Sequence, residues 1–270
     1  MRAILFATAA IAAISTCAHA EDAAVDELVV TATRLPLPVE LVAGARVIDE
    51  TEIRQRQAVF LTDVLATTPG VAVARNGAFG GVATVRIRGA APDKTLVVLD
   101  GVPLNDPADP NGAFDFANLQ LADIARVETL SGPQGSIWGS QGIGGVIALT
   151  TQELDGWRLT AEAGSMATGR LHGGAGFSEA GYAVSGSVTG FRTDGVSKAA
   201  SGSEEDGYET WTGQLSGRIQ LSDRLQLDGR LRYTEAEVEI DGFAAPLYVL
   251  GDTDAKNRSE IWSGLVRARA

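Results

Sequence analysis

Apolar and polar side chains alternate with a period of two along much of the chain after residue 156, which is typical of β-strands. Residues 209–221 show the pattern most clearly, with small or apolar residues on one face and polar residues on the other. The first face holds Trp211, Gly213, Leu215, Gly217, Ile219 and Leu221, and the second holds Thr210, Thr212, Gln214, Ser216, Arg218 and Gln220. Five further segments repeat this scheme. Because a protein core does not tolerate a charged face, we expect the apolar face to meet lipid and the polar face to meet water.

The connections between these segments alternate in length. Short turns are expected at 178–181 and 222–224, long polar loops at 193–208 and 240–258, and a shorter link on the long-loop side at 164–169. Bacterial outer-membrane barrels have short periplasmic turns, long outer loops and strands of about ten residues. The pattern therefore predicts about six antiparallel membrane strands. After the first twenty residues, no stretch approaches the roughly 18 consecutive apolar residues of a spanning helix.

Residues 39–151 predict a compact α+β region with short elements between turn signals. Strands are expected at 46–48, 71–74, 84–88, 95–99, 126–130 and 146–150, and helical segments from Asp49 or Thr51 through Gln57, at 62–67 and at 121–125. Glycine is concentrated between residues 131 and 145, where it allows tight turns. This segment is no phosphate-binding loop, because it contains no GxxxxGK[ST] and no GxGxxG that runs from a strand into a helix.

The first twenty residues have the features of a secretory signal. Arg2 precedes an apolar run from Ala3 to Ile14, and small residues at 18 and 20 offer a cleavage site before Glu21. Cys17 as a lipoprotein cysteine is the alternative, although the residues before it make a poor lipobox. Cleavage removes the only cysteine and excludes disulfides and cysteine metal sites.

Charge and side-chain chemistry narrow the function further. With 34 acidic and 22 basic residues the formal net charge is −12, so nucleic acid is not an expected partner. An enzyme is not expected either, because the sequence has no nucleophile elbow, paired histidines or clustered catalytic acids. No cofactor is expected except calcium, for which Asp206 and Asp241 in the long loops are suitable oxygen ligands. The alternative for these residues is a solvated acidic face.

The order and spacing of several short blocks resemble the TonB-dependent receptor family, and most closely its cobalamin-receptor (BtuB-like) branch. The blocks are Asp63-Val64-Leu65 with Pro69-Gly70-Val71, then 85–89 (VRIRG), 97–103 (VVLDGVP), 123–128 (DIARVE) and 132–147 (GPQGSIWGSQGIGGVI). The β-prone run 26–34 resembles the TonB box, where the resemblance implies binding of the inner-membrane protein TonB. The box residues are Glu27, Leu28, Val29, Val30, Thr31 and Ala32. Such a run also suits strand addition to a partner's sheet edge, or an ordinary first strand.

The resemblance implies an α+β plug domain followed by the first six or so antiparallel strands of an incomplete transmembrane β-barrel. The expected divisions are a signal peptide at 1–20, a TonB-box segment at 21–38, a plug at 39–151 and an N-terminal part of a barrel at 152–270. Plugged transporter barrels have about 22 strands, so a truncated, non-transporting fragment is the rival interpretation.

The resemblance also implies an outer-membrane receptor, a monomer in contact with lipid, that takes up cobalamin or a ferric siderophore with energy from TonB and its inner-membrane complex. Haem and carbohydrate receptors share these plug motifs. Arg86, Arg88 and Glu128 are expected to couple plug and barrel or to pair with each other, and plain salt bridges within the plug are equally compatible with the sequence. The apical plug loops are expected to contact substrate, the alternative being solvated loops, through Asn76, Phe79, Asn105, Asp106 and Phe114.

Overall fold

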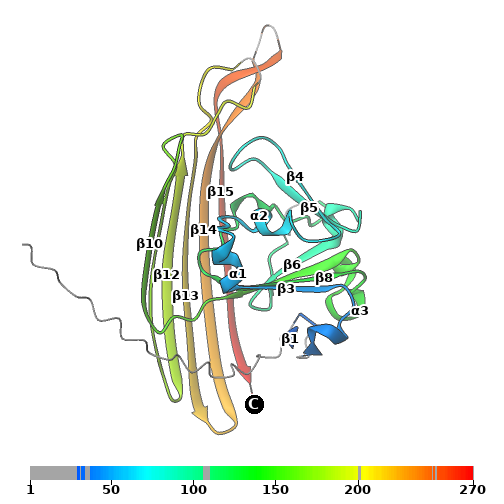
Figure 1. Cartoon of the computed structure of the whole chain (residues 1–270), viewed down its shortest axis with the longest axis vertical. Coiled ribbons are helices and arrows are strands. Elements are labelled where there is room, and N and C mark those ends of the chain that lie inside the picture. Colours follow the sequence, from blue (N-terminus) through cyan, green and yellow to red (C-terminus); the bar gives the residue numbers. More distant parts are fainter. Residues whose placement is uncertain are drawn as a thin grey trace, which may run out of the picture.

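The computed structural model describes residues 29–30, 32–33, 37–105, 110–199, 202–244, 246 and 248–269. They form a globule, here termed the plug, and a six-stranded sheet, here termed the wall. Figure 1 shows the wall as a curved sheet along one side of the plug, and α1 and α2 lie on the side of the plug that faces the wall. In the described residues, no helix is both long enough and apolar enough to cross a bilayer.

The plug is built on a mixed five-stranded sheet with the strand order β3-β8-β9-β6-β7. These strands are β3 (Ala45–Asp49), β8 (Ile124–Ser131), β9 (Gly145–Thr151), β6 (Thr95–Leu99) and β7 (Val102–Pro103). The β6 and β9 strands are parallel, and the other pairs are antiparallel. Separate hairpins are formed by β1 (Val29–Val30) with β2 (Leu37–Pro38) and by β4 (Val71–Arg75) with β5 (Ala83–Ile87).

Short helical elements connect the plug strands. They are η1 (Val39–Leu41), α1 (Glu50–Gln55), α2 (Leu61–Leu65), η2 (Pro92–Lys94), η3 (Phe116–Asn118), α3 (Gly135–Trp138) and η4 (Ser140–Gly142). The expected cap of the first helix is confirmed, because the Asp49 carboxylate accepts the Glu52 N–H at 2.8 Å. The helical turn expected at 121–125 was wrong: Ile124 already begins β8, and its side chain lies in the core. Strand pairing and burial thus override a weak local helix signal there.

The wall contains β10 (Gly156–Ala163), β11 (Gly169–Glu179), β12 (Tyr182–Thr193), β13 (Tyr208–Ser222), β14 (Leu225–Ala244) and β15 (Val249–Arg269). Each strand pairs antiparallel with the next, and β10 and β15 are the two edges of an open sheet. The loop expected at 240–258 was wrong, because β14 and β15 stay paired through most of it, with an irregularity between Ile240 and Gly242. Polar residues and glycine break the alternation in this outer part, which also carries the exposed apolar side chains Phe243 and Val249.

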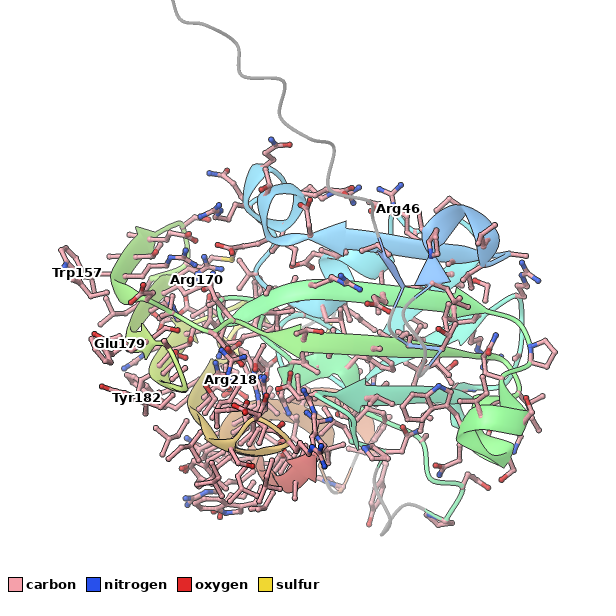
Figure 2. The ribbon with its side chains drawn as sticks, turned by 90° about the horizontal axis from the view of Figure 1, so that it is seen from below. Arg46, Trp157, Arg170, Glu179, Tyr182 and Arg218 are labelled. Atoms are coloured by element: carbon pink, nitrogen blue, oxygen red, sulfur yellow. The ribbon has the colours of Figure 1, made fainter. Side chains whose placement is uncertain are left out.

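The two faces of the wall differ as the alternation predicts. Trp157 is 81% exposed on the outward face, whereas Thr210 is fully buried on the inward face against the plug. Figure 2 shows Trp157 and Tyr182 pointing away from the plug and Arg170 pointing toward it. An apolar surface this large and continuous is the surface that lipid covers in outer-membrane strands. The prediction of an apolar outside and a polar inside is therefore confirmed.

Candidate functional site

The contact between plug and wall is the candidate functional site, and it is polar in its middle part. Arg158 lies 2.9 Å from the Glu50 carboxylate, and Arg230 lies 3.0 Å from Asp100. Arg232 forms an ion pair with Asp123, in which both side chains are buried. In these three pairs the wall supplies the cation and the plug supplies the anion.

An aromatic cluster joins plug and wall nearer the long-loop end. The plug contributes Phe60 and Phe79, and the wall contributes Phe191 and Tyr208. The Phe191 ring lies 5.2 Å from each of the two plug rings, at distances typical of favourable aromatic pairs. The Tyr208 hydroxyl donates to Asn118 Oδ1 of the plug at 2.9 Å, so the buried phenol keeps its hydrogen bond.

The residues predicted to couple plug and barrel lie elsewhere. Arg86 is exposed on β5, and Arg88, which has a φ of 51°, extends its guanidinium toward Gly44 within the plug. Glu128 is 1% exposed and pairs with Arg126 of its own strand. Glu128 thus makes a salt bridge within the plug, one of the two arrangements that the sequence left open. Arg158, Arg230 and Arg232 lie on the polar face of the wall, but nothing in the sequence shows which plug carboxylates they meet.

The segment predicted as the TonB box is packed against the plug at the box residue whose contacts the structure describes. Ala32 is 2% exposed, and its N–H donates to Glu128 Oε2 at 2.7 Å. The Trp138 indole N–H donates to the Ala32 carbonyl, also at 2.7 Å. Both backbone groups of one box residue are thus held by plug side chains. The box positions Glu27, Leu28 and Thr31 lie outside the described residues.

The predicted substrate-loop residues separate into two groups. Asn76 is exposed at the β4–β5 turn, and Phe79 packs in the aromatic cluster. Phe114 is instead a core residue, with its ring 4.9 Å from Phe116. Asp106 lies outside the described residues.

Asn105 is a structural residue of its loop. Its Oδ1 accepts the Val97 N–H at 2.8 Å, and its Nδ2 donates to the carbonyls of Thr95 and Gly112. These three bonds use most of the hydrogen-bonding capacity of the amide, so Asn105 does not offer a free amide to a ligand.

Three carboxylates gather at the outer loops. Glu204, Asp206 and Asp241 each place one oxygen within 4.8 Å of the others. Asp206 is 1% exposed, and its Oδ1, like that of Asp241, is buried without a hydrogen-bond partner. Burial raises the pKa of the Asp206 carboxyl above its usual range, although the Lys198 N–H partly offsets this. An all-oxygen, acidic set of this kind fits a hard cation such as calcium.

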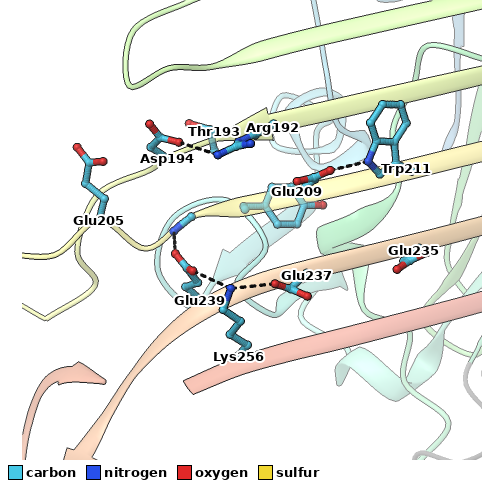
Figure 3. A pocket seen from close by; sticks show the side chains of 12 residues that line it. Arg192, Thr193, Asp194, Glu205, Glu209, Trp211, Glu235, Glu237, Glu239 and Lys256 are labelled. Atoms are coloured by element: carbon cyan, nitrogen blue, oxygen red, sulfur yellow. Dashed lines mark hydrogen bonds and ion pairs between the residues drawn. The ribbon is translucent and has the colours of Figure 1, made fainter. Parts of the chain in front are cut away.

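A second group of charges lies on the outward face of the wall. Figure 3 shows Lys256 between Glu237 and Glu239, each carboxylate 3.0 Å away, and the Trp211 indole bonded to Glu209. These residues line a hollow that opens at the end of the apolar belt. Trp211 and Trp262 are exposed on this face and Tyr233 packs against Trp262, an arrangement typical of the aromatic girdles of outer-membrane strands.

Comparison with known proteins agrees with this architecture. Residues 39–146 match the family described as the TonB-dependent receptor plug domain. The ferripyoverdine receptor of Pseudomonas aeruginosa matches with a TM-score of 0.67 and 17% identity over 89% of this chain and 33% of that chain. The siderophore receptor PirA of Acinetobacter baumannii matches with a TM-score of 0.58 and 16% identity, over 82% of this chain and 44% of PirA. The ferric-catecholate import receptor Fiu of Escherichia coli K12 matches with a TM-score of 0.59 and 20% identity, over 76% of this chain and 28% of Fiu.

Residues 39–146 therefore match a TonB-dependent receptor plug domain, and the six antiparallel strands that follow have the fold of the N-terminal part of the ferripyoverdine receptor. It spans about a third of the length of the ferripyoverdine receptor. The matched family model is that of a receptor domain, and the three neighbours are described as receptors.

Proposed function

We propose that this chain is the plug-bearing part of a receptor that imports a scarce nutrient across the outer membrane, with energy supplied by TonB. The observation that carries the proposal is the plug seated on the polar face of a lipid-facing wall. In that position the plug fills the space beside the wall, so a ligand passes only after the plug moves. A pull on the chain from the periplasm is a physical means of moving it.

A ferric siderophore is the ligand class that the comparisons favour. The ferripyoverdine receptor is described as bound to ferripyoverdine, and PirA is described as a siderophore receptor. Cobalamin, the ligand of the branch that the plug motifs resemble, has no support from these neighbours and remains the alternative. Binding of ferripyoverdine, ferric enterobactin and cyanocobalamin to cells that display the receptor separates the two classes.

The TonB-box proposal is tested by a proline in the box. Strand addition uses backbone hydrogen bonds, so Val30→Pro should abolish energised uptake of the bound ligand, whereas Val30→Ala should retain it. Ligand binding at the cell surface should be unchanged in both variants. Uptake of radiolabelled ligand into whole cells, compared with binding at 0 °C, gives the measurement. Normal uptake by Val30→Pro would contradict strand addition at the box, and uptake by neither variant would indicate a side-chain role for Val30.

We further propose that Glu204, Asp206 and Asp241 bind calcium and thereby order the outer loops. A cation would satisfy the unpartnered oxygens of Asp206 and Asp241 and relieve the repulsion among three carboxylates. The donor set contains no nitrogen or sulfur, which distinguishes it from a zinc site.

Calcium at one hundred times its dissociation constant should stabilise the folded chain by about 2.7 kcal/mol. Asp206→Asn should remove this effect, because the substitution deletes one charge from the site. Asp254→Asn, which alters an exposed carboxylate of the same outer hairpin, should not. Thermal unfolding in calcium and in chelator measures the difference. Equal melting temperatures in the two solutions for the unmodified chain would contradict the calcium site.

A further inference from the structure

The plug loop between β4 and β5 is packed directly against the outer loop 194–207 of the wall. A Cβ atom added at Gly77 would lie 3.0 Å from Lys198 Cγ and Cδ, and one added at Gly80 would overlap the Tyr208 ring. Both glycines have positive φ values, 85° and 74°, so the turn needs glycine for its backbone as well as for this close approach. The two loops are therefore fitted to each other.

Lys198 is fixed from the wall side at two points. Its N–H donates to Asp206 Oδ2 at 2.6 Å, and its Nζ donates to the Glu239 carbonyl. Between these two points the aliphatic part of the side chain crosses Gly77. A lysine commonly covers a surface with its methylene chain while its charged end is bonded elsewhere. The position of Lys198 over the plug thus depends on the carboxylate that anchors its backbone.

Asp206 in turn belongs to the network that shapes the outer loop. Asp241 accepts the Ala199 N–H at 2.5 Å, and Asp252 accepts the Ser203 N–H at 2.9 Å. The loop 194–207 is therefore folded by carboxylates of its own chain segment and of the β14–β15 hairpin. Lys198 supplies the atoms nearest to Gly77, so a change at these carboxylates reaches the plug loop through the backbone of Lys198.

We propose that Lys198 is a positioning residue that transmits the state of the outer carboxylates to the β4–β5 loop of the plug. The proposal rests on the proposed receptor function, because only a receptor needs a connection between an outer loop and the plug. Asp206 holds the backbone of Lys198, and its methylene chain holds the plug loop at Gly77. Occupancy of the outer loops is in this way coupled to the order of the plug.

A nitroxide label at Asn76→Cys reports the motion of the plug loop on the nanosecond scale. In outer membranes that contain the receptor, the label should give a broad, immobilised spectrum. Asp206→Ala and Lys198→Ala should each shift it to a narrow, mobile spectrum. The double variant should shift it no further than either single one, because both act through one connection.

Two controls separate this coupling from general loosening. Lys198→Met keeps an aliphatic chain over Gly77 and should keep the label immobilised. Arg258→Ala removes an exposed cation that pairs with Glu235 and Glu260 and should have no effect. A label at Thr67→Cys, exposed on the plug outside the contact, should report the same motion in all variants.

An immobile label in Lys198→Ala, or additive shifts in the double variant, would overturn the proposal. This readout needs neither ligand nor energy, whereas the uptake assay with Val30→Pro needs both. If Lys198→Ala loosens the label but the cells take up no ligand, only the receptor function is contradicted. If the cells take up ligand but the label stays immobile in Lys198→Ala, only the role of Lys198 is contradicted.

Discussion

Replacing Glu128 by alanine should lower the free energy of unfolding of the plug by about 3 kcal/mol and release the TonB-box segment. Glu128 is buried and is bonded to Arg126 and to the Ala32 N–H. Its loss removes the acceptor of the buried Ala32 N–H and one carboxylate partner of Arg126. Because a quarter of the Arg126 side chain is exposed, the cost stays below that of breaking a fully buried ion pair.

The release is measured by the rate at which trypsin cleaves after Arg34, and the stability by urea unfolding in detergent. Trp138→Phe removes the bond to the Ala32 carbonyl and should cost about 1 kcal/mol. Glu162→Ala, which breaks an exposed pair with Arg170, should cost at most about 1 kcal/mol and leave cleavage unchanged. Faster cleavage in Glu162→Ala than in Glu128→Ala would show that Glu128 does not hold the box segment.

The plug is held at several separate places. Ala32 is held at one end of the plug by Glu128 and Trp138, and the β4–β5 loop is held at the other end by Lys198 and Tyr208. Between them three ion pairs join plug and wall, of which only Arg232–Asp123 is buried on both sides. Because a buried ion pair costs more to break than a hydrogen bond, we expect the contacts of Ala32 to open before that pair does.

The wall was predictable from the sequence to the level of its faces. Period-two alternation places Trp157 on the apolar face and Thr210 on the polar face, in agreement with their exposure. The faces are well specified, because a one-residue shift in register would exchange them. Alternation fails beyond Ile240, where the register is irregular, and backbone pairing continues the strands. In the plug, strand existence was predictable from short apolar runs, but the turn at 121–125 was not, because pairing with β9 decides it.

The candidate site was less predictable, for a physical reason. Which arginine meets which carboxylate depends on how two separately folded units dock, and neither unit encodes this in a local pattern. Arg232 and Asp123 are 109 residues apart in the sequence, yet they form a buried pair. Phe114 was predicted to contact substrate because its loop is rich in turn residues. In the structure its ring lies in the core of the plug. Asp206 was correctly placed in the loop between β12 and β13, whereas Asp241 lies on β14 rather than in a loop; the structure brings Glu204 close to both.

Replacing Arg232 by alanine should destabilise the docked plug by about 3–5 kcal/mol, because it leaves the Asp123 carboxylate buried without a counter-charge. The Arg232 side chain is 9% exposed and that of Asp123 is 2% exposed, so water cannot compensate. The double variant Arg232→Ala/Asp123→Ala should recover part of the loss, since it removes the orphaned charge as well. Arg258→Ala, whose side chain is 57% exposed, should cost at most about 1 kcal/mol. Urea unfolding followed by tryptophan fluorescence measures all three variants, and a double variant less stable than Arg232→Ala would show that the pair does not act as a unit.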